Sequence, residues 1–206
     1  MKPYNYDFRA DLNWSKGINA ERDKDVIRRF FGKSCVSVEK TAVEQDRQGD
    51  DYIVRLRHGA TVLVDAKRRK PGASRYWKRE PDLQLEIWSV MPQPGLPRGK
   101  AGWTLSESSN TDLILFSYDP SDTDAAYLVP FQILRMAFRH NLPLWKQQYK
   151  TTKPQDNGTW QSQCMFVPRS IVAQAIEELQ WNSTIPLVRG GQLELPGFSE
   201  VGVFNA

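Results

Sequence analysis

The sequence has few of the features that cross-link a chain or anchor it in a membrane. Its 206 residues include two cysteines, Cys35 and Cys164, which lack any Cys-x-x-Cys or Cys/His spacing. This argues against a zinc site and favours two reduced core thiols over a disulfide. No window approaches 18 apolar residues and the first residues lack the apolar stretch of a secretory signal. We therefore expect a cytoplasmic protein with no membrane span.

Internal repeats, low-complexity tracts and a strong charge imbalance are also lacking. The hydrophobic fraction of 40% and the charged fraction of 25% are ordinary for a globular protein. The net charge of +4 is compatible with an anionic partner but does not identify one. A chain of this length can bury roughly 70% of its extended-chain surface, so we expect a single domain over 1–206.

Hydrophobic periodicity predicts an α/β fold with a mixed central sheet flanked by helices. The predicted helices cover 19–31, 131–138 and a segment that Ser170 caps, and the predicted strands cover 36–38, 52–56, 60–66, 83–88, 113–118 and 126–129. The turn at His58-Gly59 joins two of these strands into a hairpin. Its second strand contains three consecutive apolar residues, Val62 to Val64, and should lie in the middle of the sheet.

Charged residues stand at the end of this apolar strand. Asp65 and Lys67 are two positions apart, so their side chains point to the same face of the sheet. Asp51 and Asp65 lie at similar distances from the hairpin turn and should meet across the strand pair. Two facing carboxylates repel each other, and a divalent cation would relieve the repulsion. Oxygen ligands of this kind suit Mg²⁺ or Mn²⁺.

The segments Gly49-Asp50-Asp51-Tyr52 and Val64-Asp65-Ala66-Lys67, joined by a hairpin, resemble the PD-(D/E)xK nuclease superfamily. The resemblance implies a restriction-endonuclease-like core that binds Mg²⁺ or Mn²⁺ and cuts phosphodiester bonds. The superfamily's proline is missing before Asp51 and Asp50 takes the neighbouring place, so either aspartate can be the ligand.

The stretch from Lys16-Gly17 to Glu21-Arg22 resembles the leading helix of archaeal-type Holliday junction resolvases, which implies that Glu21 is a further metal ligand. The resemblance extends over Gly102-Trp103 to the strand ending at Tyr118. It implies a nuclease-like core over about 15–130, with a helical and strand elaboration over about 131–206.

Each of these residue types has a chemical use in such a reaction. Asp51 and Asp65 would hold the ion, which lowers the pKa of a bound water and offsets phosphate charge. Lys67 would orient or deprotonate the attacking water, or stabilise charge on the phosphate. Metal charge and desolvation both favour neutral lysine, so we expect the pKa of Lys67 to be lowered.

A strongly basic segment follows the strand. It contains seven basic residues and no acidic one over 67–79: Lys67, Arg68, Arg69, Lys70, Arg75, Lys78 and Arg79. We expect these side chains to contact the DNA backbone and Trp77 to stack on exposed bases. RNA is an alternative partner, because phosphate contacts carry no sequence information.

The sequence thus predicts a metal-dependent deoxyribonuclease, with endonuclease or exonuclease action and the oligomeric state left open, a homodimer included. The alternatives are a nucleic-acid-binding protein with this fold that does not cleave, and a protein in which Asp65 and Lys67 form an ordinary ion pair. Glu21 can equally be a solvated residue of the first helical turn. Gln84 and Glu86 share a polar strand face that lines the site or faces solvent.

Overall fold

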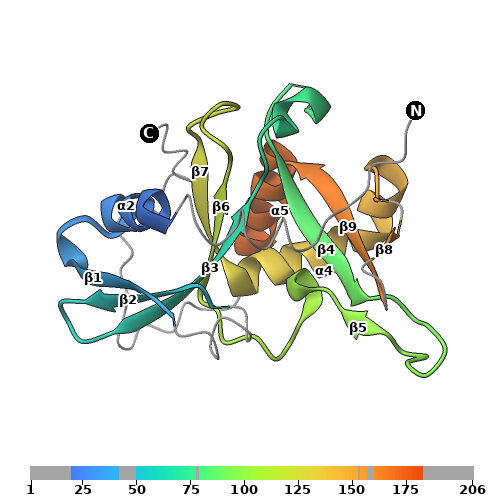
Figure 1. The fold of residues 1–206 in the computed structure, drawn as a ribbon, viewed down its shortest axis with the longest axis horizontal. Helices are drawn as coiled ribbons and strands as arrows, with labels where there is room; N and C mark the ends of the chain where they lie inside the picture. Colours follow the sequence, from blue (N-terminus) through green and yellow to red (C-terminus); the bar gives the residue numbers. More distant parts are fainter. Residues whose placement is uncertain (1–19, 42–49, 78, 153, 157–159, 183–206) are drawn as a thin grey trace.

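The protein folds as α/β with two β-sheets (Figure 1). The structure is a computed structural model and describes residues 20–41, 50–77, 79–152, 154–156 and 160–182. The first sheet has the strand order β1-β2-β3-β6-β7, and the second has the order β5-β4-β9-β8. The mixed sheet predicted from the sequence is therefore present, and a second sheet stands beside it.

The first sheet carries the hairpin that the sequence predicts. Its strands are β1 (Cys35–Lys40), β2 (Tyr52–Leu56), β3 (Thr61–Arg68), β6 (Leu113–Ser117) and β7 (Ala126–Pro130). The strands β1, β2 and β3 pair antiparallel, β3 pairs parallel to β6, and β7 pairs antiparallel to β6. As predicted, β3 has a neighbour on each side.

Helix α2 (Ala20–Phe31) covers one face of this sheet (Figure 1). Its buried Ile27 and Phe31 pack in one apolar cluster with Val54, Val64 and Leu115 from the sheet. The helix ends where Gly32 takes a positive φ of 51° at the start of a 3-10 turn (η1, Gly32–Ser34), which confirms the predicted end of the helix at residue 31. The predicted first residue of this helix, residue 19, lies outside the described residues.

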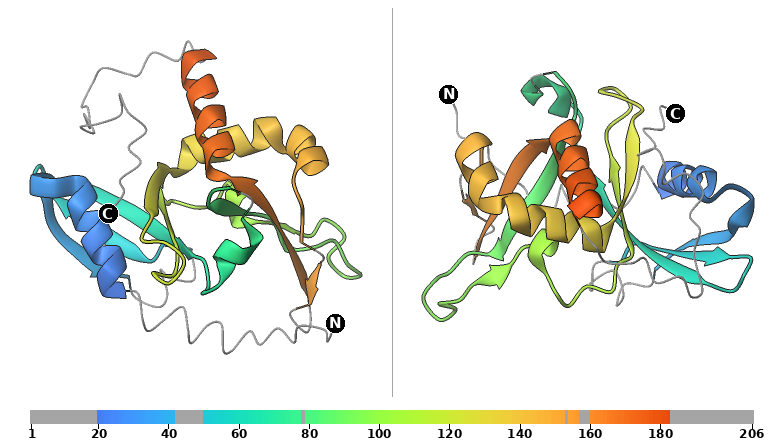
Figure 2. Two further views of the ribbon diagram at one scale, coloured as in Figure 1. Left: turned by 90° about the horizontal axis from the view of Figure 1, so that it is seen from above. Right: turned by 180° about the vertical axis from the view of Figure 1, so that it is seen from behind.

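The second sheet consists of β4 (Asp82–Val90), β5 (Lys100–Ala101), β8 (Gln155–Asp156) and β9 (Gln161–Pro168). Its buried side chains pack with helices α4 (Phe131–Gln148) and α5 (Arg169–Asn182), which Figure 2 shows beside one another. The sequence predicts β4 but not β9, and β9 pairs with β4 over Asp82–Trp88. Strand β9 therefore completes a sheet whose first strand, β4, lies between β3 and β6 in the sequence. Both cysteines are free and Cys164 is buried on β9.

Helix α4 runs well beyond the predicted 131–138 and contains Pro143. Proline removes one backbone donor from a helix, yet the chain stays helical as far as Gln148, and Trp145 is only 2% exposed in the core. Tertiary packing of this indole thus outweighs the local preference of the proline. In the part of the chain that the structure describes, no helix is long and apolar enough to cross a membrane.

Candidate metal centre and nucleic-acid interface

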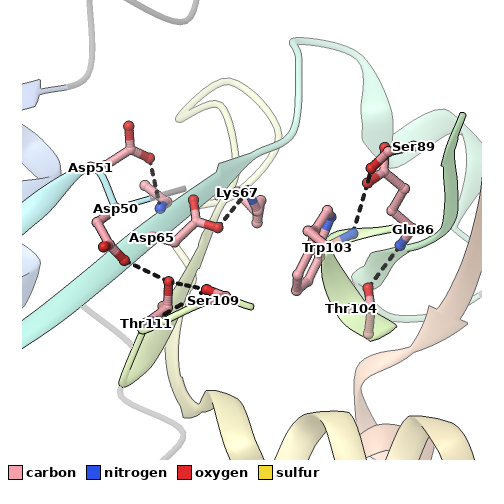
Figure 3. A network of polar contacts seen from close by, with 11 residues as sticks. Asp50, Asp51, Asp65, Lys67, Glu86, Ser89, Trp103, Thr104, Ser109 and Thr111 are labelled. Carbon is pink, nitrogen blue, oxygen red and sulfur yellow. Dashed lines mark hydrogen bonds and ion pairs between the residues drawn. The ribbon is translucent and has the colours of Figure 1, made fainter. Parts of the chain in front are cut away.

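The register of the hairpin places Asp51 across from Asp65. Tyr52 pairs with Val64, so the preceding and following residues face each other. The backbone N–H of Asp51 donates to Val64 O at 2.9 Å, and Asp51 Oδ2 accepts the N–H of Ala66 at 2.8 Å. Figure 3 shows both aspartates at this end of the hairpin. The hairpin thus brings together the two carboxylates that the sequence predicts as a pair.

Asp65 and Lys67 share one face of β3 and form an ion pair. Lys67 Nζ lies 2.6 Å from Asp65 Oδ2, and their side chains are 28% and 7% exposed, respectively. On the parallel strand β6 their neighbours are Ile114 and Phe116, which pack in the cluster formed with the second sheet and α4. The pair therefore projects toward the second sheet, away from α2.

Burial raises the pKa of Asp65 to about 6 from its ordinary value of 3.8. The Lys67 ammonium and its hydrogen bond oppose this shift, and the negative charges of Asp51 and Asp50 add to it. Such a shift is typical of carboxylates gathered in a site of low polarity.

The stability that Asp65 contributes should fall as the pH rises from about 4 to about 6. Its folded pKa lies above the unfolded value. The stabilisation is therefore complete below the unfolded value and lost as the pH rises through the folded one. In urea unfolding at several pH values, the free energy of unfolding of Asp65→Asn should rise by up to about 3 kcal/mol relative to that of the wild-type protein over this range. A pH-independent difference between the two proteins would contradict a raised pKa.

The expected lowering of the Lys67 pKa is not what its surroundings produce. Burial acts to lower it, as expected, but the charge and hydrogen bond of Asp65 and the charges of Asp51 and Glu86 outweigh burial, and the pKa is raised. The prediction considered the effects of burial and of a metal ion on this pKa. It did not include the charges of Asp65, Asp51 and Glu86, which raise the pKa.

The neighbouring Asp50 is held by other partners. Its Oδ1 accepts the hydroxyl of Thr111 at 2.6 Å, and its backbone oxygen accepts the hydroxyl of Thr41 at 2.5 Å. Asp50 is 5% exposed. Of the two candidate ligands, Asp51 is the one that pairs across the hairpin with Asp65.

The structure does not bring Glu21 into contact with these residues. The side chain of Glu21 is 76% exposed and pairs with Lys24 one turn along α2. The carboxylate of this helix that meets the sheet is Asp23, which is fully buried and bonded to Arg68 and Tyr52. It lies on the face of the sheet that α2 covers.

Two arginines of the basic segment, Arg68 and Arg69, lie inside the protein, contrary to their predicted contact with nucleic acid. Arg68, with 8% of its side chain exposed, forms an ion pair with Asp23. Arg69 lies 3.0 Å from Asp82, donates to Gln84 at 3.0 Å and stacks over Phe166. These two cations neutralise internal carboxylates and join the two sheets and α2.

The remainder of the segment folds onto the hairpin of β6 and β7. Its 3-10 turn (η2, Ala73–Tyr76) is capped by Asp122, which accepts the N–H of Ala73 at 2.8 Å. Trp77 packs edge-on against Tyr118 and is partly buried.

The exposed cations of this segment are Arg75 and Arg79, its exposed aromatic residue is Tyr76, and Lys70 is partly buried. The Arg75 guanidinium lies 4.7 Å from the centre of the Tyr76 ring, which is 67% exposed. The exposed aromatic is thus Tyr76, whereas the prediction named Trp77. Lys78 lies outside the described residues.

Two further residues lie across from the hairpin: Trp103, which the sequence does not assign to the site, and Glu86, whose strand face was predicted either to line the site or to face solvent. Trp103 belongs to a 3-10 turn (η3, Trp103–Leu105), and its ring centre is 5.0 Å from Lys67 Nζ. Glu86 on β4 contributes to the raised pKa of Lys67. The polar face of β4 was the available signal, since Glu86 alternates with buried Leu85 and Ile87.

Among the described residues, no group of three or more His, Cys, Asp or Glu side chains is arranged to hold a metal ion. The described part of the chain offers two aspartates, Asp51 and Asp65, at opposed positions of the hairpin. The chain matches no model of a known protein family, and neither a curated protein nor a solved structure matches it.

Proposed function

We propose that the protein is a metal-dependent nuclease that hydrolyses phosphodiester bonds of DNA. The observation that supports this is the placement of Asp51 across from Asp65, with Lys67 beside Asp65 on the same face of β3. This is the arrangement of acidic residues and lysine that the resemblance to the PD-(D/E)xK superfamily implies. The proposed partner is DNA, and no binding to a membrane is proposed. The preference for DNA over RNA rests on the resemblance alone.

The donor set fits Mg²⁺ or Mn²⁺. Asp51 and Asp65 offer hard carboxylate oxygens, and Mg²⁺ is commonly bound through one or two carboxylates with several waters retained. Asp50 fits less well, because its carboxylate already accepts the hydroxyl of Thr111. The ion would lower the pKa of a bound water and neutralise part of the phosphate charge.

Lys67 acts in this proposal as a fixed positive charge. The carboxylates of Asp65, Asp51 and Glu86 favour the charged ammonium. A protonated lysine can orient a water molecule or stabilise negative charge that builds on the phosphate. General-base catalysis would need the neutral amine, which the carboxylates around Lys67 disfavour.

The proposal is tested by incubating linear, circular and branched DNA with the protein and Mg²⁺, Mn²⁺ or EDTA. We expect cleavage with either metal, none with EDTA, and none by Asp65→Asn in any buffer. Purified protein that binds these DNAs and leaves them intact with both metals would instead support a binding protein with this fold.

The ion pair itself favours a second candidate, a structural role. At 2.6 Å, Asp65 and Lys67 satisfy each other without a metal. In that case Mn²⁺ would not bind, and its addition would leave the thermal unfolding temperature unchanged. Stabilisation by Mn²⁺ that disappears in Asp65→Asn would rule this candidate out.

Nucleic-acid binding should depend on the exposed cations of the basic segment and not on the buried ones. Replacing Arg75 and Arg79 with alanine should weaken binding to unrelated duplex sequences about equally. It should also make the log–log salt slope shallower by about 0.9 for each lost phosphate contact. Fluorescence anisotropy at salt concentrations from about 50 to about 200 mM measures both the affinity and its salt dependence.

A charge-matched variant separates a binding surface from the general effect of net charge. Arg28→Ala with Arg29→Ala removes the same charge from exposed positions of α2, remote in sequence from the basic segment. If this variant flattens the salt slope as much as the Arg75 and Arg79 pair, the basic segment is not the binding surface.

A further inference from the structure

The ring of Trp103 faces the Lys67 ammonium from the opposite side of the site (Figure 3). Lys67 Nζ is 5.0 Å from the ring centre, within the range of a cation–π contact. We propose that Trp103 is a positioning residue that holds Lys67 in its working place, and that Glu86 and Gly102 fix Trp103. This inference rests on the proposed function and adds to it a residue outside the aspartate–lysine motif.

The ring of Trp103 has little freedom to move. Its centre lies 6.1 Å from the ring of Phe116 on β6 and 6.2 Å from that of Phe131 on α4. Phe116 is the β6 neighbour of Lys67 in the parallel register. The indole therefore packs on the same patch of the first sheet from which the lysine projects.

The backbone beside the ring is fixed to β4. Glu86 Oε2 accepts the N–H of Trp103 at 2.9 Å, and the N–H of Glu86 donates to the Thr104 hydroxyl at 2.9 Å. Gly102 lies so close to β4 that an added Cβ would be 2.2 Å from Glu86 O. A glycine is required there, and the three contacts set the position of η3 on the strand.

The physical reason for such a residue is competition for Asp65. Lys67 takes its position in part from the Asp65 carboxylate, which the proposed reaction assigns to a divalent cation as well. The face of an indole attracts an ammonium through its quadrupole and is no ligand for a hard cation, which prefers oxygen. The ring can therefore hold Lys67 whether or not the carboxylate also binds metal.

Steady-state cleavage kinetics of Trp103→Phe and Trp103→Leu test whether loss of the aromatic ring slows the reaction. Leucine should lower kcat on the order of tenfold with little change in KM, and phenylalanine should retain most of the rate because it keeps an aromatic face. Glu86→Gln should also retain most of it, since the amide oxygen still accepts the N–H of Trp103. Trp145→Leu removes a core indole from the last turn of α4, the helix whose first residue, Phe131, packs on Trp103, and should leave kcat unchanged.

A nuclear magnetic resonance measurement tests the geometry without relying on activity. In protein labelled with ¹³C-lysine, the ε-methylene protons of Lys67, assigned by their loss in Lys67→Met, should show an upfield ring-current shift. The shift should disappear in Trp103→Leu and persist in Trp145→Leu. An unshifted signal in the wild-type protein would overturn the inference even if DNA is cleaved.

The two proposals can fail separately. A wild-type protein that does not cleave DNA but shows the ring-current shift refutes the nuclease and leaves the placement of Lys67 by Trp103 standing. A protein that cleaves DNA equally fast with and without the Trp103 ring refutes the positioning role alone.

Discussion

Replacing Lys67 with alanine is expected to slow DNA cleavage by about 10²- to 10³-fold, while binding of Mn²⁺ and DNA changes little. The ammonium lies beside Asp65 and can serve the phosphate as charge builds on it, whereas the aspartates serve the metal. Asp65→Ala should lose metal affinity as well as cleavage. Single-turnover rates and calorimetric titration with Mn²⁺ distinguish the two variants.

Two further variants sharpen the interpretation. Lys67→Arg keeps a positive charge and should retain part of the rate if charge stabilisation is the role. Lys146→Ala removes an exposed lysine from α4 and should behave like the wild-type protein. If Lys67→Ala cleaves as fast as Lys146→Ala, Lys67 takes no part in the chemistry.

The pairing of Asp51 with Asp65 was predictable because a hairpin is a local structure. The turn at His58-Gly59 sets the register, and the spacing from the turn then determines which residues face each other. The same-face placement of Asp65 and Lys67 follows from the two-residue period of a strand. Both expectations concern neighbours within one hairpin, and the register of the strands agrees with both.

The roles of Arg68 and Arg69 were not predictable from the same segment. Their partners, Asp23 and Asp82, lie 45 and 13 residues away in the sequence and reach them through α2 and β4. The composition of a basic run does not show which of its members are neutralised inside the fold. The alternating pattern of β3 gave one indication, since Arg68 shares its face with the buried Val64 and Ala66.

The second sheet was missed for a related reason. The sequence predicts β4 by its alternation of Leu83, Leu85 and Ile87, but the partner strand β9 comes some 80 residues later and reads as fragments before a helix. Pairing over that distance depends on α4 and α5 packing on the completed sheet. The position of Trp103 opposite Lys67 depends on this sheet, so it could not be derived before the topology was known.

Replacing Arg68 with alanine is expected to destabilise the protein by about 3–5 kcal/mol, because it leaves a buried carboxylate unpaired. Asp23 is fully buried, and Arg68 Nε donates to it at 2.6 Å. The unfolding temperature should fall by roughly 2–4 °C for each kcal/mol in a chain of this size. Arg75→Ala, on the exposed part of the basic segment, should change stability by less than about 0.5 kcal/mol.

The pH dependence of the Arg68→Ala defect identifies its cause. Burial raises the pKa of Asp23 even with Arg68 beside it, and removing the guanidinium raises that pKa further. A raised folded pKa gives stability that is present at low pH and lost as the pH rises through that pKa. The loss of stability in Arg68→Ala should therefore be smaller at about pH 5 than at about pH 8. Replacing Asp23, Tyr52 and Arg68 together with Leu, Phe and Met removes the buried carboxylate along with its phenol and guanidinium partners, and should restore most of the stability. A defect that is equal at both pH values and persists in the triple variant would mean that Arg68 stabilises the fold through packing of its side chain and not through its charge.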